Sequence, residues 1–309
     1  MIITVTLNAA MDKTVWIDSL KRGGLNRIRR IENDGSGKGI NVSRSLYAIG
    51  EKSLATGFLG GTNGMAILKD VQANGIEHDF VMTKSNTRTN TKVREDDGTL
   101  TEINEPGAFV TPEEIEELVS RLAQYANPET LFILSGSIPQ GAEPDIYARL
   151  IRILHEKGAS VLLDASGEPF RLGVAEKPKI IKPNRVEIEE YCGLSEDSST
   201  EEIIEAARSL VASGIGTVAV TNGQKGAMLF TGDIGYACDA LPVVVGSTVG
   251  AGGAFAAGLA YGWKYHLEPD KTMELCMAAS AATVTTQGTK PASAELINEL
   301  KKDVHLTRI

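Results

Sequence analysis

The 309-residue sequence predicts a doubly wound α/β sheet flanked by helices. Short unbroken apolar runs recur in its second half, segments of helical period separate them, and 42% of all residues are hydrophobic, enough for a large core. Strands that are apolar on both faces are typical of parallel sheets covered by helices. No repeat, low-complexity tract or linker is visible, so we expect one domain over residues 1–309.

The apolar runs give the expected strands of this sheet. They are Leu131–Leu134, Val161–Leu163, Ile180–Ile181, Val218–Val220 and Val243–Val245. The helices between them have recognisable ends. Thr111-Pro112-Glu113-Glu114 is a capping box with proline in the first turn. A second apolar face formed by Ile203, Ile204, Ala207, Leu210 and Val211 precedes Gly214.

Two segments, 11–34 and 86–106, lack this alternation. The first contains Val15-Trp16-Ile17 and then a cationic patch. The second predicts two polar strands, Thr87 to Glu95 and Leu100 to Asn104, joined at Asp97-Gly98. We expect the two segments to form a small β-sheet lid standing off the main domain.

Charge and composition exclude several classes of protein. The net charge of −9 and pI near 5.1 argue against a nucleic-acid or anionic-membrane partner. The N-terminus lacks signal-peptide features and no apolar run approaches about 18 residues, so we expect a cytoplasmic protein. The three cysteines and four histidines are scattered, which indicates neither a disulfide framework nor a zinc site.

A glycine-rich turn follows the expected strand Val243–Val245 and opens an apolar helix. The first backbone N–H groups of such a helix lack intrahelical partners, and with the helix dipole they favour an anion such as a transferring phosphate. Glycines that merely permit tight packing explain the turn equally well.

Two familiar phosphate loops are excluded. Gly37-Lys38 is not a Walker A loop, because position 32 is Glu and position 39 is Gly, and Phe255 breaks the dinucleotide fingerprint.

Seven motifs then occur in order along nearly the whole chain. They are Thr6–Asp12, Gly37–Arg44, Arg88–Lys92, Ser135–Gly141, Leu163–Gly167, Lys182–Glu187 and Thr248–Gly252. With these motifs the sequence resembles the PfkB, or ribokinase-like, carbohydrate kinases, and within them the 1-phosphofructokinase and tagatose-6-phosphate kinase branch. The resemblance implies a ribokinase-like fold and ATP-dependent phosphorylation of a ketose phosphate, fructose 1-phosphate or tagatose 6-phosphate, with Mg²⁺.

The resemblance also implies the residues on the sugar side. They are Asp12, Gly37, Lys38, Asn41, Arg88 and Arg27. Asp12 and Asn41 would hydrogen-bond ketose hydroxyls, although turn or capping roles would also explain them. Lys38 and Arg88 would bind the phosphate already on the substrate. Arg27 is a third candidate, from a cationic patch that otherwise reads as a solvated face.

On the nucleotide side the resemblance implies a second set of residues. They are Lys182, Asn184, Thr221, Gly223, Gly226, Gly250 and Gly252 for ATP, with Glu187 near Mg²⁺ through water. Asn184 is equally well explained as a helix N-cap.

The resemblance implies that phosphoryl transfer takes place at Gly250, Ala251, Gly252 and position 253. At position 253 the family has an Asp that acts as general base, whereas this sequence has Gly253. We expect binding to survive and turnover to fall, since a positioned base contributes about 10² to 10⁴ in rate. The alternative is a non-catalytic sugar-phosphate or nucleotide binding protein of the same fold. The edges of the lid sheet predict a homodimer.

Overall fold

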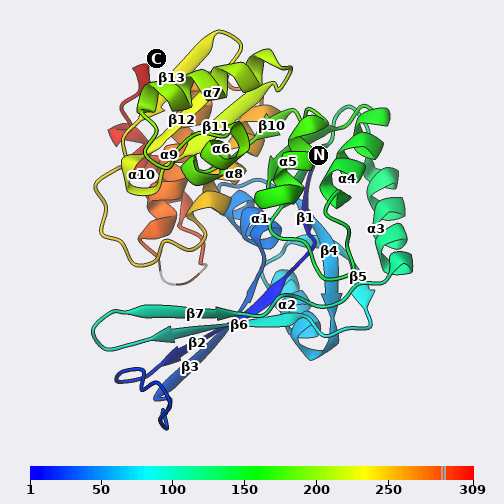
Figure 1. Ribbon diagram of the computed structural model, residues 1–309, viewed down its shortest axis with the longest axis vertical. Coiled ribbons are helices and arrows are strands. Elements are labelled where there is room, and N and C mark those ends of the chain that lie inside the picture. The colour runs from blue at the N-terminus through cyan, green and yellow to red at the C-terminus, as the bar shows by residue number, and fades with distance from the viewer. Residues whose placement is uncertain (287, 289) are drawn as a thin grey trace.

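The computed structural model describes the whole chain except residues 287 and 289, and its main feature is a ten-stranded sheet (Figure 1). In spatial order the strands are β14 (Thr307–Arg308), β13 (Ile234–Cys238), β12 (Ala227–Thr231), β11 (Thr217–Thr221), β10 (Ile180–Ile181), β9 (Ser160–Asp164), β8 (Leu131–Ser135), β1 (Ile2–Thr6), β4 (Leu54–Gly60) and β5 (Glu77–Thr83). The strands from β11 to β5 are parallel, and β12, β13 and β14 add an antiparallel edge. The predicted α/β class is confirmed.

Helices cover both faces of this sheet. One face packs against α1 (Lys38–Ala48), α2 (Gly61–Ala73), α8 (Ala251–Lys264) and α9 (Pro269–Val284), with α10 (Ala294–Leu300) beside α9. The other face packs against α3 (Pro112–Tyr125), α4 (Ile146–Glu156), α5 (Gly167–Ala175), α6 (Arg185–Cys192) and α7 (Thr200–Ala212). Two short 3₁₀ turns span Gly223–Lys225 and Lys301–Asp303. Among the described helices, none has the length and apolar character needed to cross a membrane.

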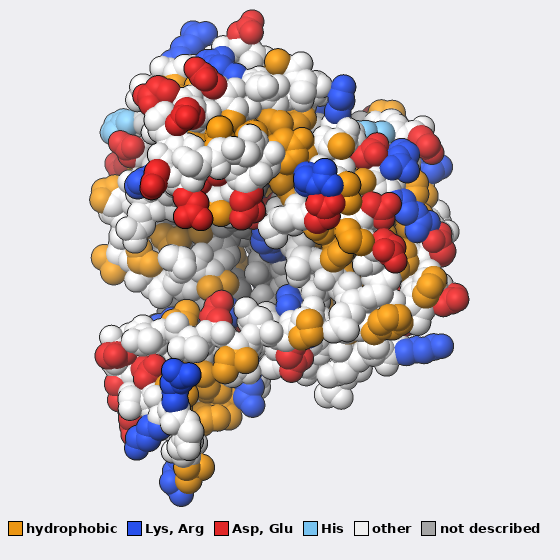
Figure 2. Space-filling model, in the orientation of Figure 1, with side chains coloured by type: hydrophobic (Ala, Val, Ile, Leu, Met, Phe, Trp, Pro, Cys, Tyr) orange, Lys and Arg blue, Asp and Glu red, His pale blue; other side chains and the backbone are white. Residues whose placement is uncertain are grey.

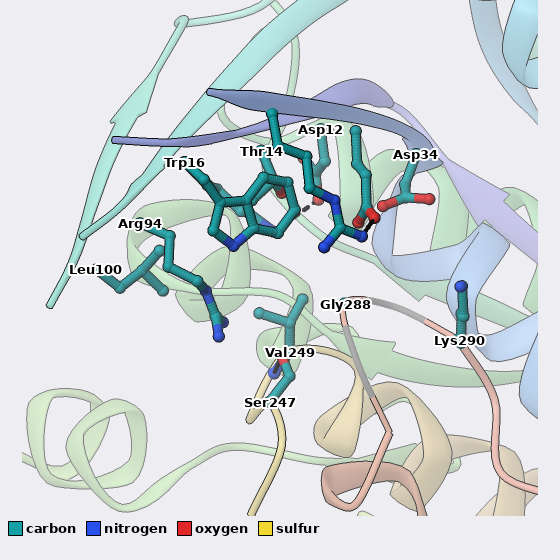
Figure 3. A pocket seen from close by; sticks show the side chains of 13 residues that line it. Asp12, Thr14, Trp16, Asp34, Arg94, Leu100, Ser247, Val249, Gly288 and Lys290 are labelled. Carbon is teal, nitrogen blue, oxygen red and sulfur yellow. Dashed lines mark hydrogen bonds and ion pairs between the residues drawn. The ribbon is translucent and has the colours of Figure 1, made fainter. Parts of the chain in front are cut away.

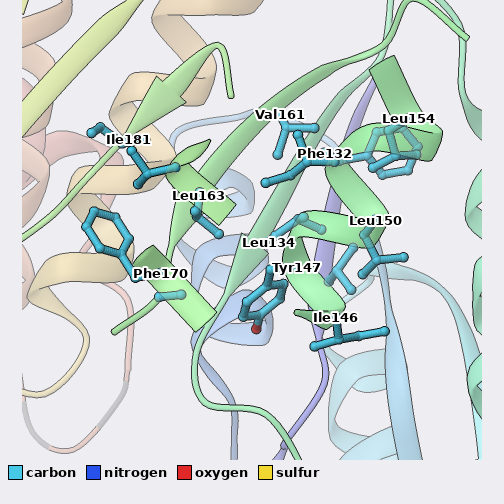
Figure 4. Close-up of a cluster of buried hydrophobic side chains, with 14 of the residues drawn as sticks. Phe132, Leu134, Ile146, Tyr147, Leu150, Leu154, Val161, Leu163, Phe170 and Ile181 are labelled. Atoms are coloured by element: carbon cyan, nitrogen blue, oxygen red, sulfur yellow. The ribbon is translucent and has the colours of Figure 1, made fainter. Parts of the chain in front are cut away.

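The largest part of the core lies between the sheet and the helices α3 to α7. Figure 4 shows Phe132 and Leu134 of β8 facing Leu150 and Leu154 of α4, all of them buried. Burial of each such side chain stabilises the fold by about 1.5–3 kcal/mol. Tyr147 is also buried here, and its hydroxyl donates to the Gly136 carbonyl at 3.0 Å. This core fixes the carboxyl ends of β8 and β9, where polar side chains emerge.

Most local predictions are confirmed. Four of the five apolar runs form β8, β9, β10 and β11. Thr111 caps α3, and its hydroxyl and Glu114 form the predicted capping box. The helix with the second predicted apolar face is α7, which buries Ile203, Ala207 and Leu210.

The prediction of a strand at Val243–Val245 is wrong. These residues lie in an irregular segment between β13 and α8, and Val244 is 88% exposed. The sheet already ends with the antiparallel strands β12 to β14, and proline at 242 has no N–H for a ladder. Val243 and Val245 are apolar because they line a cavity, described below, and not because they lie in a sheet.

The predicted second sheet is present and projects from the body of the molecule (Figure 1). Its strands, in order, are β3 (Arg30–Ser36), β2 (Ala10–Trp16), β6 (Arg88–Arg94) and β7 (Leu100–Asn104). The β6–β7 hairpin turns at Gly98, whose φ of +90° favours glycine, as predicted. Side chains alternate along β2, so that Asp12, Thr14 and Trp16 line cavities while Val15 packs on the opposite face.

Candidate active site

A cavity of about 470 Å³ lies between the small sheet and the body, where the space-filling view is hollowed (Figure 2). Nine of the sequence-predicted site residues line it: Asp12, Gly37, Lys38, Asn41, Arg88, Lys182, Gly250, Gly252 and Gly253. They come from the small sheet, the start of α1, the segment after β10 and the start of α8. The structure therefore brings together residues that are up to about 240 positions apart in the sequence.

The floor of this cavity is the carboxyl end of the parallel sheet. Thr6 of β1, Ser135 of β8 and Asp164 of β9 are neighbours in register there and all line the cavity. This is the edge at which open α/β sheets bind ligands. Ser135 is fully buried, and within the described part of the chain its hydroxyl has no hydrogen-bond partner. Such an orphaned buried group at a cavity wall is a ready contact for a polar ligand.

Asp12 is buried and held by two neighbours that the sequence analysis did not single out. Its Oδ1 accepts from Asn90 Nδ2 at 3.1 Å, and its Oδ2 accepts from Lys92 Nζ at 2.8 Å. Asn90 lies directly opposite Asp12 on β6, and Lys92 follows two residues later on the same face. The signal for both was the motif Arg88–Lys92, which contains them. A carboxylate has lone pairs to spare beyond these two bonds, so Asp12 can still accept from a ligand.

Asp164 is a further site residue that the sequence analysis did not select, although it lies within one of the seven motifs. It is 1% exposed, and its Oδ1 lies 3.0 Å from Lys38 Nζ and 3.2 Å from Lys182 Nζ. Burial alone would raise the pKa of Asp164, but the charges of Lys182 and Lys38 outweigh it and hold the pKa below its usual value. One buried carboxylate thus fixes two ammonium groups at the cavity wall.

Arg88 lies at the base of the small sheet with its guanidinium partly buried. It donates to the backbone carbonyls of Glu105 at 2.7 Å and Asn8 at 3.4 Å. Burial lowers the pKa of Arg88, and the Asp12 and Glu105 carboxylates oppose that shift. Its Nε is buried and lacks a partner among the described residues, so the side chain retains donor capacity for an anion.

Arg27 is not brought into this site. It is exposed on the segment that joins β2 to β3, and it lines none of the cavities described for this chain.

The start of α8 forms another wall of the cavity. Gly250 is its N-cap with φ of +93°, and Ala251, Gly252 and Gly253 supply the first turn, whose N–H groups lack intrahelical acceptors. A Cβ built on Gly253 would meet Asn41 Cβ at 3.6 Å, an ordinary contact, so there is room for a side chain. A Cβ built on Gly252 would lie 3.6 Å from Lys182 Nζ. An ammonium group and the positive end of a helix dipole therefore converge here, as an anion requires.

A second cavity, of about 510 Å³, lies on the other side of this helix start. It is lined by the predicted Thr221, Gly223, Gly226, Ala251 and Gly252 and by apolar side chains that include Val243, Val245 and Phe255. Gly252 belongs to the walls of both cavities. A mostly apolar pocket and a polar, cationic one thus meet at the first turn of α8.

Asn184 and Glu187 begin α6 and are not among the residues that line these two cavities. They form a complete capping box: Glu187 N–H donates to Asn184 Oδ1 at 2.9 Å, and Asn184 N–H donates to Glu187 Oε2 at 2.7 Å. The N-cap interpretation of Asn184 therefore holds. Burial raises the pKa of Glu187, while the Asn184 N–H, Lys38 and Lys182 oppose that shift.

A metal would have to be held at this site by few protein ligands. Within the described residues, no group of three or more His, Cys, Asp or Glu side chains is arranged to bind a metal ion. Mg²⁺ keeps several waters and often takes only one or two carboxylates with substrate phosphates. Asp164 is already paired with Lys38 and Lys182, so a hydrated Mg²⁺ on the Glu187 carboxylate fits this mode of binding better.

A smaller cavity of about 110 Å³ extends the main one along the small sheet, sharing Asp12 and Lys92 with it. Figure 3 shows Trp16 and Arg94 of the sheet facing the segment that carries Ser247 and Val249. The Arg30 guanidinium stacks 4.5 Å from the Trp16 ring centroid. The inner face of the sheet is therefore charged and aromatic along its length, consistent with a wall that covers a polar ligand.

Comparisons with known proteins agree with this architecture. The family model described as pfkB family carbohydrate kinase matches residues 5–295. The 1-phosphofructokinase of Haemophilus influenzae is 31% identical over 309 residues, which cover 100% of this chain and 98% of that protein. The 1-phosphofructokinase of Bacillus subtilis is 32% identical over 309 residues, covering 100% of both. The crystal structure of Escherichia coli phosphofructokinase-2 in complex with potassium has the same fold, with a TM-score of 0.93 at 24% identity over 98% of each chain. The chain belongs to the pfkB family of carbohydrate kinases.

Proposed function

We propose that this protein belongs to a lineage that transfers the γ-phosphoryl group of ATP to a hydroxymethyl group of a ketose phosphate, fructose 1-phosphate or tagatose 6-phosphate. The observation that carries the proposal is the meeting of two cavities at Gly252. The apolar cavity suits an adenosine group, and the polar, cationic cavity suits a sugar phosphate. The first turn of α8 between them is where the transferring phosphoryl group would lie.

In this proposal each wall of the polar cavity has a separate task. Asp12 accepts hydrogen bonds from ketose hydroxyls, and Asn41 contacts the sugar beside the transfer point. Arg88 and Lys38 bind the phosphate that the substrate already carries. Lys182 forms an ion pair with Asp164, and its ammonium group lies beside the first turn of α8. There it neutralises charge on the transferred phosphoryl group.

Mg²⁺ would be held by Glu187 through water, and when bound it neutralises charge on the nucleotide phosphates. The capping box leaves Glu187 Oε1 outside its two hydrogen bonds. Its carboxylate can therefore serve both the helix start and a hydrated cation.

Gly253 limits the reaction in this proposal. The acceptor hydroxyl attacks the γ-phosphorus, the bond to the β-phosphate oxygen breaks, and the hydroxyl proton needs an acceptor. Gly253 supplies none, so we propose low turnover with intact binding. The second candidate function, a binding protein of the same fold, is favoured by the same glycine.

The test combines titration calorimetry with an assay of ADP formation. Binding of ATP and of one ketose phosphate, preferred over the unphosphorylated sugar, with slow ADP formation supports the kinase lineage. Binding with no ADP formation above background favours the binding protein. Failure to distinguish fructose from fructose 1-phosphate contradicts both candidates.

We also propose that the small sheet mediates a homodimer. On the face opposite the cavities, Ile31 and Ile103 are 49% and 59% exposed beside the buried Val15 and Val93. An apolar sheet face of this kind suits a second copy of the same chain. Replacing Ile31 and Ile103 with glutamate should convert the dimer to a monomer in sedimentation equilibrium. A wild-type protein that is monomeric at all concentrations contradicts the proposal.

A further inference from the structure

The side chain of Asn41 is held by a buried arginine that has no role in the scheme above. Asn41 lies on α1 and lines the main cavity. Its Oδ1 accepts from Arg44 Nη1 at 2.9 Å. Arg44 follows three residues later on the same face of the helix, the spacing at which side chains meet. Arg44 is only 7% exposed. Because arginine is rarely buried without a charged partner, such a partner is expected nearby.

The partner of Arg44 is on the neighbouring helix. Arg44 Nη2 pairs with Asp70 Oδ2 of α2. The other oxygen of Asp70 accepts from Asn74 Nδ2 at 3.2 Å. A chain of charge-assisted bonds therefore runs from the end of α2 to the wall of the cavity and fixes the orientation of the Asn41 amide.

This orientation determines what Asn41 offers to a ligand. One of the two lone pairs of its oxygen is engaged by Arg44, whereas among the described residues its Nδ2 has no acceptor. The guanidinium charge on Oδ1 polarises the amide, and that strengthens the remaining donor. Asn41 also adjoins position 253, since a Cβ built there would lie 3.6 Å from Asn41 Cβ.

We infer that Asn41 acts as a hydrogen-bond donor, to an oxygen of the sugar beside position 253, and that Arg44 and Asp70 are positioning residues that turn the Asn41 amide nitrogen toward the ligand. Asp12 is then the complementary acceptor. The two residues would therefore make opposite hydrogen bonds to the sugar. Asn41 donates to one sugar oxygen, and Asp12 accepts from sugar hydroxyls. The inference rests on the proposed function, because it requires a sugar ligand in this cavity.

The test measures binding of fructose 1-phosphate and tagatose 6-phosphate by calorimetry, with ATP as the second ligand. Asn41→Asp keeps the size of the side chain and its contact with Arg44 but removes the donor. We expect this variant to bind the sugar phosphate about tenfold or more weakly and ATP unchanged. Measurements at low and high salt separate a lost donor from repulsion of the substrate phosphate, because only the repulsion is screened.

Arg44→Met tests the positioning role. We expect weaker sugar-phosphate binding with unchanged ATP binding, and partial recovery in Arg44→Lys, which keeps the charge but cannot bridge Asn41 and Asp70 with a planar fork. Arg149→Met is the matched control, because it removes an arginine that pairs with Glu116 on the exposed surface. Thermal unfolding of each variant separates loss of fold from loss of orientation.

The outcomes separate the inference from the function on which it rests. If the wild-type protein binds neither ketose phosphate, the proposed function fails. If the wild type binds and Asn41→Asp binds equally well or more tightly, Asn41 accepts a hydrogen bond from a sugar hydroxyl and the inference fails. If the weakening in Asn41→Asp disappears at high salt, repulsion explains it and the inference also fails. Should Arg44→Met not fold, Asn41→Asp decides alone.

Discussion

Replacing Gly253 with aspartate tests the proposed reason for low turnover. A Cβ at this position would lie 3.6 Å from Asn41 Cβ and 3.6 Å from the Val42 nitrogen. Both are ordinary van der Waals contacts, so a Cβ fits at this position without moving the backbone. The new carboxylate would stand in the first turn of α8, beside the cavity in which the acceptor hydroxyl would lie.

The expected magnitudes follow from this position. Replacing a glycine within a helix raises the free energy of unfolding by up to about 0.5–1 kcal/mol. The gain is smaller for aspartate, because aspartate is itself a weak helix former. A negative charge near a helix N-terminus adds about 0.3–1 kcal/mol. We therefore expect Gly253→Asp to be about 0.5–1 kcal/mol more stable than the wild type. The rate of phosphoryl transfer should rise about 10² to 10⁴-fold with little change in affinity, because a base acts in the transition state.

The assay is ADP formation at saturating ATP and ketose phosphate, with calorimetry for both ligands. Gly253→Asn is the matched control, because it fills the same space and offers no base, and it should not raise the rate. A wild-type turnover already in the usual kinase range of about 1–100 s⁻¹ would refute the reasoning, since another group would then supply the base. Gly253→Asp that binds both ligands and stays inactive would favour the binding-protein alternative.

Three further predictions concern charged residues of the site. Arg88→Met should weaken sugar-phosphate binding about tenfold to a hundredfold, the loss of a charge-assisted bond, while calorimetry shows ATP binding unchanged. An equal loss for both ligands would contradict this. Glu187→Gln should raise the Mg²⁺ concentration needed for nucleotide binding in a metal titration, and glutamine preserves the capping box. An unaltered Mg²⁺ dependence would leave Glu187 with the capping role alone. Asp164→Asn should lower the free energy of unfolding by about 3–5 kcal/mol near neutral pH, because it leaves the buried ammonium group of Lys182 without a counter-charge. The pKa of Asp164 is depressed in the folded state, so its contribution is complete above the ordinary value of 3.8 and is lost as the pH falls through the lower folded value. Urea unfolding should therefore show the difference between wild type and variant shrinking below that pH, and a constant difference would contradict the assignment.

The sequence predicts the interior of the sheet better than its edge. The runs that became β8 and β9 are apolar because helices cover both faces, so their composition carries enough information. Val243–Val245 has the same composition for a different reason, since two of its side chains line the apolar cavity. Local composition cannot separate a buried strand from an irregular segment that lines an apolar cavity, because both are short runs of valine.

The site residues that sequence reasoning missed are those whose role depends on pairing between distant segments. Asn90 and Lys92 reach Asp12 only because β6 pairs with β2 in parallel, and the register of that pairing is set by the folded sheet. Asp164 acquires its two lysines only when β9 is placed beside the start of α1 and the end of β10. These three residues also lie in motifs that the sequence analysis identified, but their partners lie on other segments, so their roles are not visible in one stretch of chain.

The alternation along β2 makes this strand more sensitive to changes in its length than to most changes in its composition. Asp12 faces the cavity and Val15 faces the other side because they are three positions apart, and an odd step along a strand reverses the face. Deleting one residue between them would place both on the same face, so that either the carboxylate leaves the cavity or the valine enters it. Substitutions at Thr14 or Lys13 change only one position each. Homologues or engineered variants should therefore tolerate many residue types in β2 but neither insertions nor deletions.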